Sequence, residues 1–262
     1  MLQLNPRRLL ACSISEVLYL FDWFLSASSG LRILMYHAVG TKALGDTRGL
    51  FSISPALFKQ HMQLLSQWSA GRIVELTSNS LKNDGCRISI TFDDGYEDNF
   101  EIAAPILYDL GLPFTVFVTS EFVRSGKKGF LSPSSLRALA GLPNVTIGSH
   151  GANHIAMTEC NEETLMNELL SSKLYLEDLI GSEVKSVAYP YGAANMRVRN
   201  AAFAAGYQLG ACSLAGTNSS SRDPLMLART EIVSLDSDRV FSQKIQGSWD
   251  WYRWRSQDPA CL

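Results

Sequence analysis

Short β-rich runs alternate with helical patterns along most of this sequence, and this alternation limits the fold more than any other feature. The runs predicted as strands cover residues 32–36, 72–76, 87–92, 114–118, 145–149, 186–189 and 208–212. Helical patterns lie between them. One opens at Ser54-Pro55, one covers 99–110 and stops at Gly111, and the longest covers about 161–180 and stops at Gly181. Such alternation predicts an α/β architecture with a largely parallel sheet.

Composition indicates an ordinary globular protein with one large core. The chain has 262 residues, of which 46% are hydrophobic and 18% charged, so one domain is expected. The net charge of -2 and the absence of a long basic run argue against nucleic acid as a partner. Five cysteines are widely spaced and form no CxxC pair, so we expect isolated thiols in a reducing compartment.

The N-terminal segment has an apolar run at residues 9–25 that follows Arg7 and Arg8. Glu16 and Asp22 interrupt the run, which argues against a membrane-spanning helix, and no clear signal cleavage site follows. We expect residues 1–30 to form an amphipathic helix that packs on the domain or, alternatively, makes peripheral contact with a membrane. The apolar residues that suggest this helix are Leu18, Leu20, Phe21, Phe24 and Leu25. The expected location is the cytoplasm or the membrane periphery.

The C-terminal tail, residues 248–262, is rich in tryptophan. Trp249, Trp251 and Trp254 could stack on a sugar ring, but such residues more often pack a terminal segment onto the core. Packing is the interpretation that we favour.

The strongest chemical signal is Ile88-Ser-Ile-Thr-Phe-Asp-Asp-Gly95, an apolar strand that ends in two adjacent carboxylates. Strand ends are where α/β enzymes place catalytic groups. The turn at Gly95 can let both carboxylates approach one site, where one binds a metal and the other takes a proton from water. Taken alone, the pattern also fits a solvated Asp-Asp-Gly loop.

A second signal, Ser149-His150-Gly-Ala-Asn-His154, also follows a predicted strand. Histidines four residues apart lie on the same side of one helical turn, so both imidazoles could reach one ion. Two histidines and a carboxylate would leave positions on zinc open for water and substrate, as in hydrolytic sites. The third signal, Ala188-Tyr-Pro-Tyr-Gly192, is a tight turn that could aim a backbone N–H as an oxyanion hole requires.

These three motifs, in this order, resemble the polysaccharide deacetylases with NodB homology, carbohydrate esterase family 4. Ile33-Leu-Met-Tyr-His-Ala-Val39 and 51–55 also resemble the opening of one branch of that family. The resemblance implies a distorted, incomplete (β/α) barrel, with residues 31–247 as the catalytic domain. It also implies that Asp93 is the general base, that Asp94, His150 and His154 bind the metal, and that the Tyr191 N–H helps to hold the oxyanion.

The chain departs from the wider family pattern at two places. Where many members have an arginine in the third motif this chain has Ala188, and we expect Arg229 to orient Asp93 instead. No histidine follows His154, so the late Leu-x-His motif that usually supplies the general acid is missing. In the resembling branch an early histidine takes that role, which makes His37 the candidate. The remaining histidine, His61, falls in a helical pattern and is expected on the surface.

The resulting expectation is a hydrolase dependent on a divalent metal, most plausibly zinc, that removes acetyl groups from N-acetylated glycans or from a lipid-linked sugar precursor. Two alternatives stay open. One is an amidohydrolase of small cyclic or linear amides on the same fold, and the other is a catalytically inactive glycan-binding module.

Overall fold

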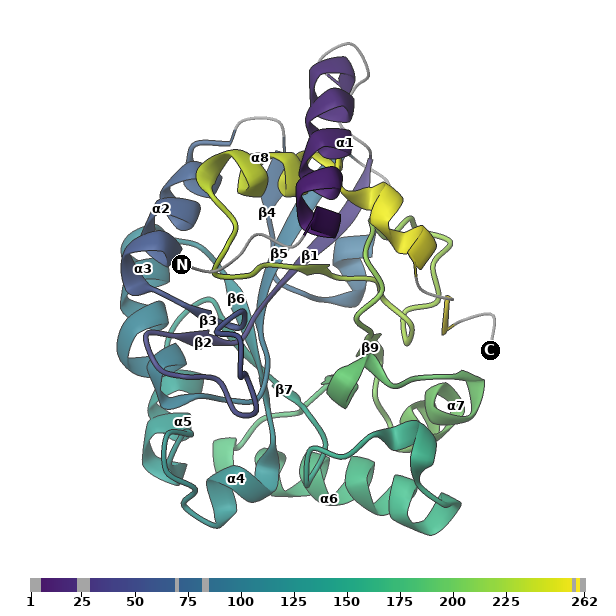
Figure 1. Cartoon of the computed structure of the whole chain (residues 1–262). Coiled ribbons are helices and arrows are strands. Elements are labelled where there is room, and N and C mark those ends of the chain that lie inside the picture. The colour runs from purple at the N-terminus through teal and green to yellow at the C-terminus, as the bar shows by residue number, and fades with distance from the viewer. Residues whose placement is uncertain (1–5, 23–28, 69–70, 82–84, 256–257, 260–262) are drawn as a thin grey trace.

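A curled, parallel β-sheet with helices on its outer side forms the body of the protein, an α/β half-barrel (Figure 1). The computed structural model describes residues 6–22, 29–68, 71–81, 85–255 and 258–259. The strand order is β10-β1-β5-β6-β7-β8-β9, and β4 pairs with the first part of β5. The strands are β1 (Gly30–Tyr36), β4 (Gly71–Ile73), β5 (Cys86–Phe92), β6 (Phe114–Val118), β7 (Val145–Ser149), β8 (Ser186–Ala188), β9 (Leu209–Ala211) and β10 (Thr230–Glu231).

The expected α/β class and incomplete barrel are therefore confirmed. Every ladder of this sheet is parallel, and residues of β1 are buried along its whole length, as expected for a strand covered on both faces. Each of the seven predicted runs overlaps a strand. The sequence patterns did not predict the two-residue strands β2 (Ala38–Val39), β3 (Ser52–Ile53) and β10, because segments this short carry no periodicity.

Helices cover the outer face of the sheet and bury their apolar sides against it. They are α2 (Pro55–Ser66), α3 (Ala104–Asp109), α4 (Ser120–Arg124), α5 (Pro133–Ala140), α6 (Glu162–Ile180), α7 (Met196–Ala204) and α8 (Asp238–Gln246). The shorter turns are η1 (Ser78–Leu81), η2 (Asn99–Ala103), η3 (Met157–Glu159), η4 (Pro190–Gly192) and η5 (Asp250–Arg255). The main core lies between this layer and the sheet, and a second cluster that includes Ile33, Phe117 and Leu227 fills the inside of the half-barrel.

Local signals at the helix ends agree with the structure. The Ser54 side chain accepts a hydrogen bond from Leu57 N at the start of α2, and Asn161 accepts one from Thr164 N at the start of α6. Gly181 ends α6 with a φ of 71°, in the left-handed conformation that favours glycine. The helix expected at 99–110 is divided, because η2 is a turn of π-helix that precedes α3.

The N-terminal helix, α1 (Pro6–Asp22), packs on α8 with a side of small and polar residues. Ala11 and Ser15 are buried, while Glu16 contacts Arg239 and Gln243 of α8. The expectation that Leu18 and Leu20 make this contact is wrong, since they are 37% and 59% exposed. The side chain of Phe21, and the whole of Phe24 and Leu25, lie outside the described residues. Within the described part of the chain, we find no helix with the length and apolar character needed to span a membrane.

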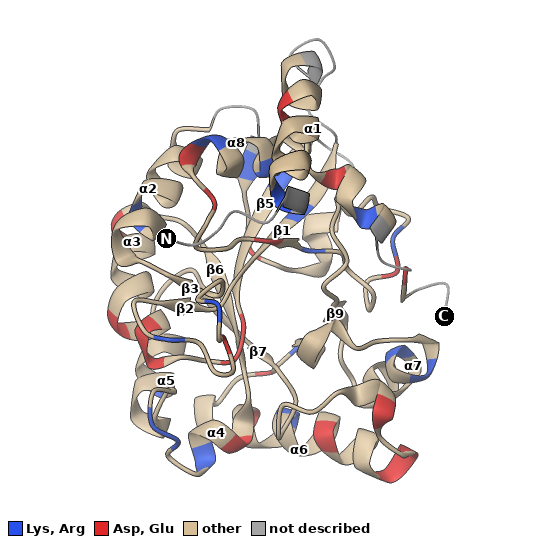
Figure 2. Ribbon diagram, in the orientation of Figure 1, with Lys and Arg blue, Asp and Glu red and all other residues tan. Residues whose placement is uncertain are grey.

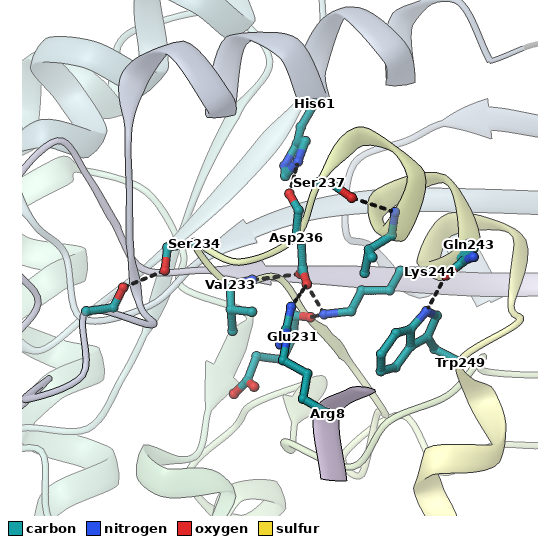
Figure 3. Close-up of polar contacts among 12 residues, drawn as sticks. Arg8, His61, Glu231, Val233, Ser234, Asp236, Ser237, Gln243, Lys244 and Trp249 are labelled. Carbon is teal, nitrogen blue, oxygen red and sulfur yellow. Dashed lines mark hydrogen bonds and ion pairs between the residues drawn. The ribbon is translucent and has the colours of Figure 1, made fainter. Parts of the chain in front are cut away.

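His61 is the clearest error of the sequence-based interpretation, because it is fully buried and not on the surface. Its ring stacks on Phe241 of α8 with the centroids 4.2 Å apart. Nε2 lies 3.0 Å from the carbonyl oxygen of Asp236, a donor position, which leaves Nδ1 to face the Tyr36 hydroxyl at 3.4 Å. The Asp236 side chain accepts in turn from Lys244 and Arg8, so one buried network joins α1, α2 and α8 (Figure 3).

The C-terminal tail also packs on the domain, which confirms the interpretation preferred for its tryptophans at two of the three positions. Trp249 is 8% exposed, and Trp251 donates its indole N–H to Ser15 of α1. Trp254 is 83% exposed. Of the five cysteines, Cys261 lies outside the described residues, and Cys12, Cys86, Cys160 and Cys212 are free thiols, as expected.

Candidate metal centre and catalytic site

The residues expected to act together follow the carboxyl ends of neighbouring strands. His37 follows β1, Asp93 and Asp94 follow β5, and His150 follows β7. Because all strands of the sheet run in the same direction, these ends meet at one rim of the half-barrel. Backbone hydrogen bonds continue past the strand ends and hold the rim, from Asp93 N to Tyr36 O and from His150 N to Val118 O.

Asp93 is held by Arg229 in a buried, two-pronged ion pair. The two guanidinium nitrogens of Arg229 lie 2.6 and 2.7 Å from the two carboxylate oxygens of Asp93, and neither residue is more than 3% exposed. Arg229 also donates Nε–H to Cys212 O, which fixes its direction. Burial raises the pKa of Asp93, but the positive charges of Arg229 and His150 outweigh this effect, so its pKa lies below the ordinary value.

Asp94, His150 and His154 form a compact cluster beside this pair. Oδ1 of Asp94 lies 3.3 Å from Nε2 of His150 and 3.1 Å from Nε2 of His154. Burial raises the pKa of Asp94, but hydrogen bonds from the two histidines lower it by more, so the pKa lies well below the ordinary value. The three ligand atoms lie within 4.8 Å of one another, so one ion could contact all three.

The two histidines do not share a helical turn, contrary to the reasoning from their spacing. They stand in a loop that connects β7 with η3, and His154 has a φ of 58°. Asp94 and Tyr191 also have positive φ, so three of the four described non-glycine residues with this conformation lie at the site. Tertiary contacts must hold such residues in place, and they concentrate at functional sites.

The donors fit a divalent metal ion. Nδ1 of His150 lies 2.8 Å from Ala188 O, and only a protonated Nδ1 can donate there, so Nε2 keeps its lone pair toward the cluster. Two imidazole nitrogens and one carboxylate oxygen are a set that zinc and neighbouring divalent metals accept.

His37 and Tyr191 lie at the edges of the cluster. The His37 ring packs on Phe51 at 4.8 Å, and its positive form lies near enough to lower the pKa of both Asp93 and Asp94. Tyr191 is 71% exposed, and its ring packs edge-on against His154 at 4.7 Å. The structure thus brings together all seven residues selected from the sequence: His37, Asp93, Asp94, His150, His154, Tyr191 and Arg229.

Comparison with known proteins agrees with this geometry. The family described as polysaccharide deacetylase matches residues 81–210, a stretch that includes both the Asp-Asp pair and the two site histidines. The protein YxkH of Bacillus subtilis (strain 168), whose name places it among the polysaccharide deacetylases, is 26% identical over 222 residues, 82% of this chain and 76% of that protein. The chain contains a polysaccharide deacetylase domain. This domain and the relative support a carbohydrate deacetylase.

Solved structures share the fold of the deacetylase domain. The deacetylase PplD of Streptococcus pyogenes, solved with acetate, has a TM-score of 0.75 at 23% identity and covers 83% of this chain and 99% of its own. IcaB from Ammonifex degensii has a TM-score of 0.68 at 20% identity, with 85% and 97% covered. The half-barrel is thus the fold of these proteins as well.

Reasoning from the sequence missed the residues that hold the loops of the deacetylase domain in place. Asp98 accepts hydrogen bonds from Val39 N and Thr41 N, and Asn99 donates one to His37 O. Glu168 of α6 accepts from the loop between the two site histidines. One signal could have identified Glu168, because a carboxylate interrupts the apolar stripe of Leu165, Leu169 and Leu176.

Proposed function

We propose that the protein removes N-linked acetyl groups from a glycan that contains N-acetylhexosamine, with release of acetate and a free amino sugar. One observation carries this proposal. A buried carboxylate kept ionised by an arginine, Asp93 with Arg229, lies beside a cluster of one carboxylate and two imidazoles that suits a divalent ion. Acetate bound to the S. pyogenes deacetylase of the same fold is the product expected of such a reaction.

In this proposal Asp94, His150 and His154 hold the divalent ion, with zinc as the first choice. The bound ion would supply a Lewis acid at the acetyl carbonyl. Tyr191 is exposed beside the largely buried cluster, which supports a substrate that approaches this rim from solvent.

The side chains then divide the proton transfers. Asp93 takes a proton from the attacking water, and Arg229 holds its two oxygens in place. The backbone N–H of Tyr191 donates to the oxyanion of the tetrahedral intermediate. His37 delivers a proton to the departing amine as the carbon–nitrogen bond breaks, so that the products are acetate and the free amino sugar.

Acetate release tests the proposal. Metal-stripped enzyme, the same enzyme with zinc restored and the Asp93→Asn variant are incubated with N-acetylglucosamine oligomers, and acetate is measured. We expect release only with the metal-restored native enzyme. Absence of release from every N-acetylated glycan, together with turnover of small cyclic or linear amides, would favour the amidohydrolase alternative. Binding of glycans without any turnover would favour an inactive glycan-binding module.

The outward side of α1 supports an extension of the proposal, in which the enzyme rests on a membrane and acts on a lipid-linked sugar or another glycan near it. Exposed apolar side chains cover this side, at Leu9, Leu10, Ile14, Val17, Leu18 and Leu20. Basic residues of α8 and η5 lie beside the helix (Figure 2); Arg253 is exposed next to the exposed Trp254, while Lys244 is buried on Asp236. An apolar helix face with basic residues and tryptophan nearby suits the surface of an anionic bilayer.

Vesicle flotation tests this extension. The protein should float with vesicles of anionic phospholipid, and the double variant Leu10→Glu, Val17→Glu should remain in the dense fraction while it keeps its activity on soluble oligomers. Equal flotation of the two proteins would contradict membrane contact through α1. The proposal places the protein in the cytoplasm or at the membrane periphery, which fractionation of cells would test.

A further inference from the structure

Glu168 is a buried carboxylate that serves the loop between the two site histidines. It projects from the apolar face of α6 and is 1% exposed. Its Oε2 accepts hydrogen bonds from Ala152 N at 3.0 Å and from Asn153 N at 2.9 Å, and its Oε1 accepts one from the Asn153 side-chain amide. Among the ion pairs of the described residues, none involves Glu168. Its partners are therefore three N–H groups of a single loop.

A second element holds the other side of the same loop. The carbonyl oxygens of Gly151 and Ala152 accept hydrogen bonds from Ser120 N and Glu121 N, the first backbone amides of α4. The loop between His150 and His154 is thus tied through its carbonyls to α4 and through its amides to α6. The two ties leave the loop little freedom to shift one histidine relative to the other.

The fit around Gly151 shows how closely Glu168 approaches this loop. Gly151 has a φ of 73°, and a Cβ placed there would lie 3.2 Å from Oε2 of Glu168 and 3.0 Å from the Met157 side chain. The amide of Gly151 donates to Ser149 Oγ, which contacts Ser172 Oγ of α6, one turn beyond Glu168. The loop is therefore fitted to this face of α6 along its first half.

Burial of a carboxylate without a cationic partner destabilises the fold unless hydrogen bonds replace its lost hydration. The three N–H groups of the loop supply these bonds to Glu168. Without Glu168, the buried amide of Ala152 and the part-buried amide of Asn153 would lose their acceptor. His154 follows directly and holds a left-handed backbone conformation, which only its surroundings can maintain. Loss of the acceptor would let this residue relax and carry its imidazole away from Asp94.

We propose that Glu168 is a positioning residue for the metal centre: it holds the 151–153 loop so that His150 and His154 present their Nε2 atoms to one ion. The inference rests on the proposed function, because that function places the ion at these histidines. It assigns to α6 a direct influence on metal affinity, although α6 itself contributes no ligand.

Zinc affinity of the purified full-length chain tests the inference, measured by competition with a chromophoric chelator. Glu168→Leu removes all three acceptor contacts at similar volume, and Glu168→Gln keeps one acceptor oxygen for the two backbone amides. Glu163→Gln is the control, because Glu163 is exposed on the same helix. Thermal unfolding of the metal-free proteins is recorded in parallel, so that a loss of affinity is not confused with a loss of the fold.

We expect Glu168→Leu to raise the zinc Kd about 10- to 100-fold, the range typical of residues that orient metal ligands. Glu168→Gln should raise the zinc Kd by less, about threefold to tenfold, because one acceptor oxygen remains. Glu163→Gln should leave the Kd unchanged. A Glu168→Leu variant that folds and binds zinc as tightly as the native chain would overturn the inference. If that variant does not fold, an unchanged Kd for Glu168→Gln would overturn it. A native chain that binds no zinc would instead contradict the proposed function.

Discussion

At the scale of single residues, the pair formed by Asp93 and Arg229 is the most informative feature of the site. The two residues are 136 positions apart in the chain, yet both guanidinium nitrogens meet the carboxylate at hydrogen-bond distance. The arginine reaches Asp93 from the segment that precedes β10, which lies two strands from β5 in the sheet, while the third motif has Ala188. An arginine at a different position in the sequence can therefore occupy the position that the chemistry requires.

Loss of the arginine should change the pH dependence of the reaction. In Arg229→Met the pKa of Asp93 is expected to rise, because burial then acts without the opposing positive charge. The base would become protonated at higher pH, so the acid limb of the kcat profile should move upward by about one pH unit or more. The acid limb of Arg229→Lys should lie between those of Arg229→Met and the native enzyme. An acid limb that stays in place would show that Arg229 does not control Asp93. The exposed pair of Arg124 and Glu121 supplies a control, Arg124→Met.

His37 permits a separate prediction, since it is expected to move a proton and not to bind the metal. His37→Ala should reduce kcat by about 10²- to 10⁴-fold, the usual contribution of a general acid, with bound zinc unchanged. The measurement is steady-state acetate release together with metal content of the same sample. Full turnover by the variant would remove His37 from the mechanism.

At the scale of elements, the turn after β5 combines several tasks in one short stretch. Asp93 and Asp94 follow the strand directly, Asp98 lies just before η2, and Asn99 is its first residue. The Asp98 carboxylate accepts from Val39 N, Thr41 N and the Thr41 hydroxyl, while Asn99 holds the His37 carbonyl. One stretch of chain thus carries the expected base and holds the segment that bears the expected acid, His37.

The hydrogen bonds from Val39 N and Thr41 N to Asp98 form a clamp on the segment that bears His37. Removal of this clamp should affect turnover more than metal binding. Asp98→Ala leaves the amides of Val39 and Thr41 without an acceptor, and a shift of the segment that bears His37 should lower kcat by about 10- to 100-fold. The zinc Kd should not change, because the histidine loop is held by other elements. Asp109→Asn, an exposed carboxylate of α3, is the control. If KM rises while kcat is unaffected, the clamp does not act through His37.

At the scale of the whole molecule, a parallel bridge between Ala211 of β9 and Leu227, just before β10, connects the two ends of the sheet, and polar contacts hold the tail against β1. Arg32 of β1 is 1% exposed and binds both carboxylate oxygens of Asp250 in the tail, at 2.7 and 2.9 Å, and the hydroxyls of Thr217 and Thr230. Trp251 then joins the tail to α1. The tail therefore connects β1 with α1.

The contribution of the contact between Arg32 and Asp250 to stability can be measured. Asp250→Ala would leave the buried guanidinium of Arg32 without its carboxylate partner, so the free energy of unfolding should fall by about 2–4 kcal/mol, less than for a wholly buried pair because Asp250 is 28% exposed. Urea unfolding checks this value, with Asp178→Asn on the exposed side of α6 as the control. A change below about 0.5 kcal/mol, the range of ordinary surface substitutions, would show that the tail adds little to the fold.

Much of the site could be predicted from the sequence, because its central residues follow strands with strong apolar patterns. β6 and β7 have the predicted limits, and the Asp-Asp and His motifs stand directly after β5 and β7. The helical geometry assigned to the histidines was wrong, since spacing alone does not distinguish a helical turn from a loop. The surface position assigned to His61 was wrong as well, because a helical pattern does not show that α8 covers that side of α2.

By itself, the sequence determined the strand and helix order, the caps at Ser54, Asn161 and Gly181, and the residue types available for metal chemistry. These features depend on neighbours within a few positions, so they can be predicted from the sequence. Only the tertiary structure decided which distant groups meet: Arg229 with Asp93, Glu168 with the histidine loop, and Arg32 with Asp250. Such contacts depend on the curvature of the whole sheet and on the packing of helices against it, which no local pattern encodes.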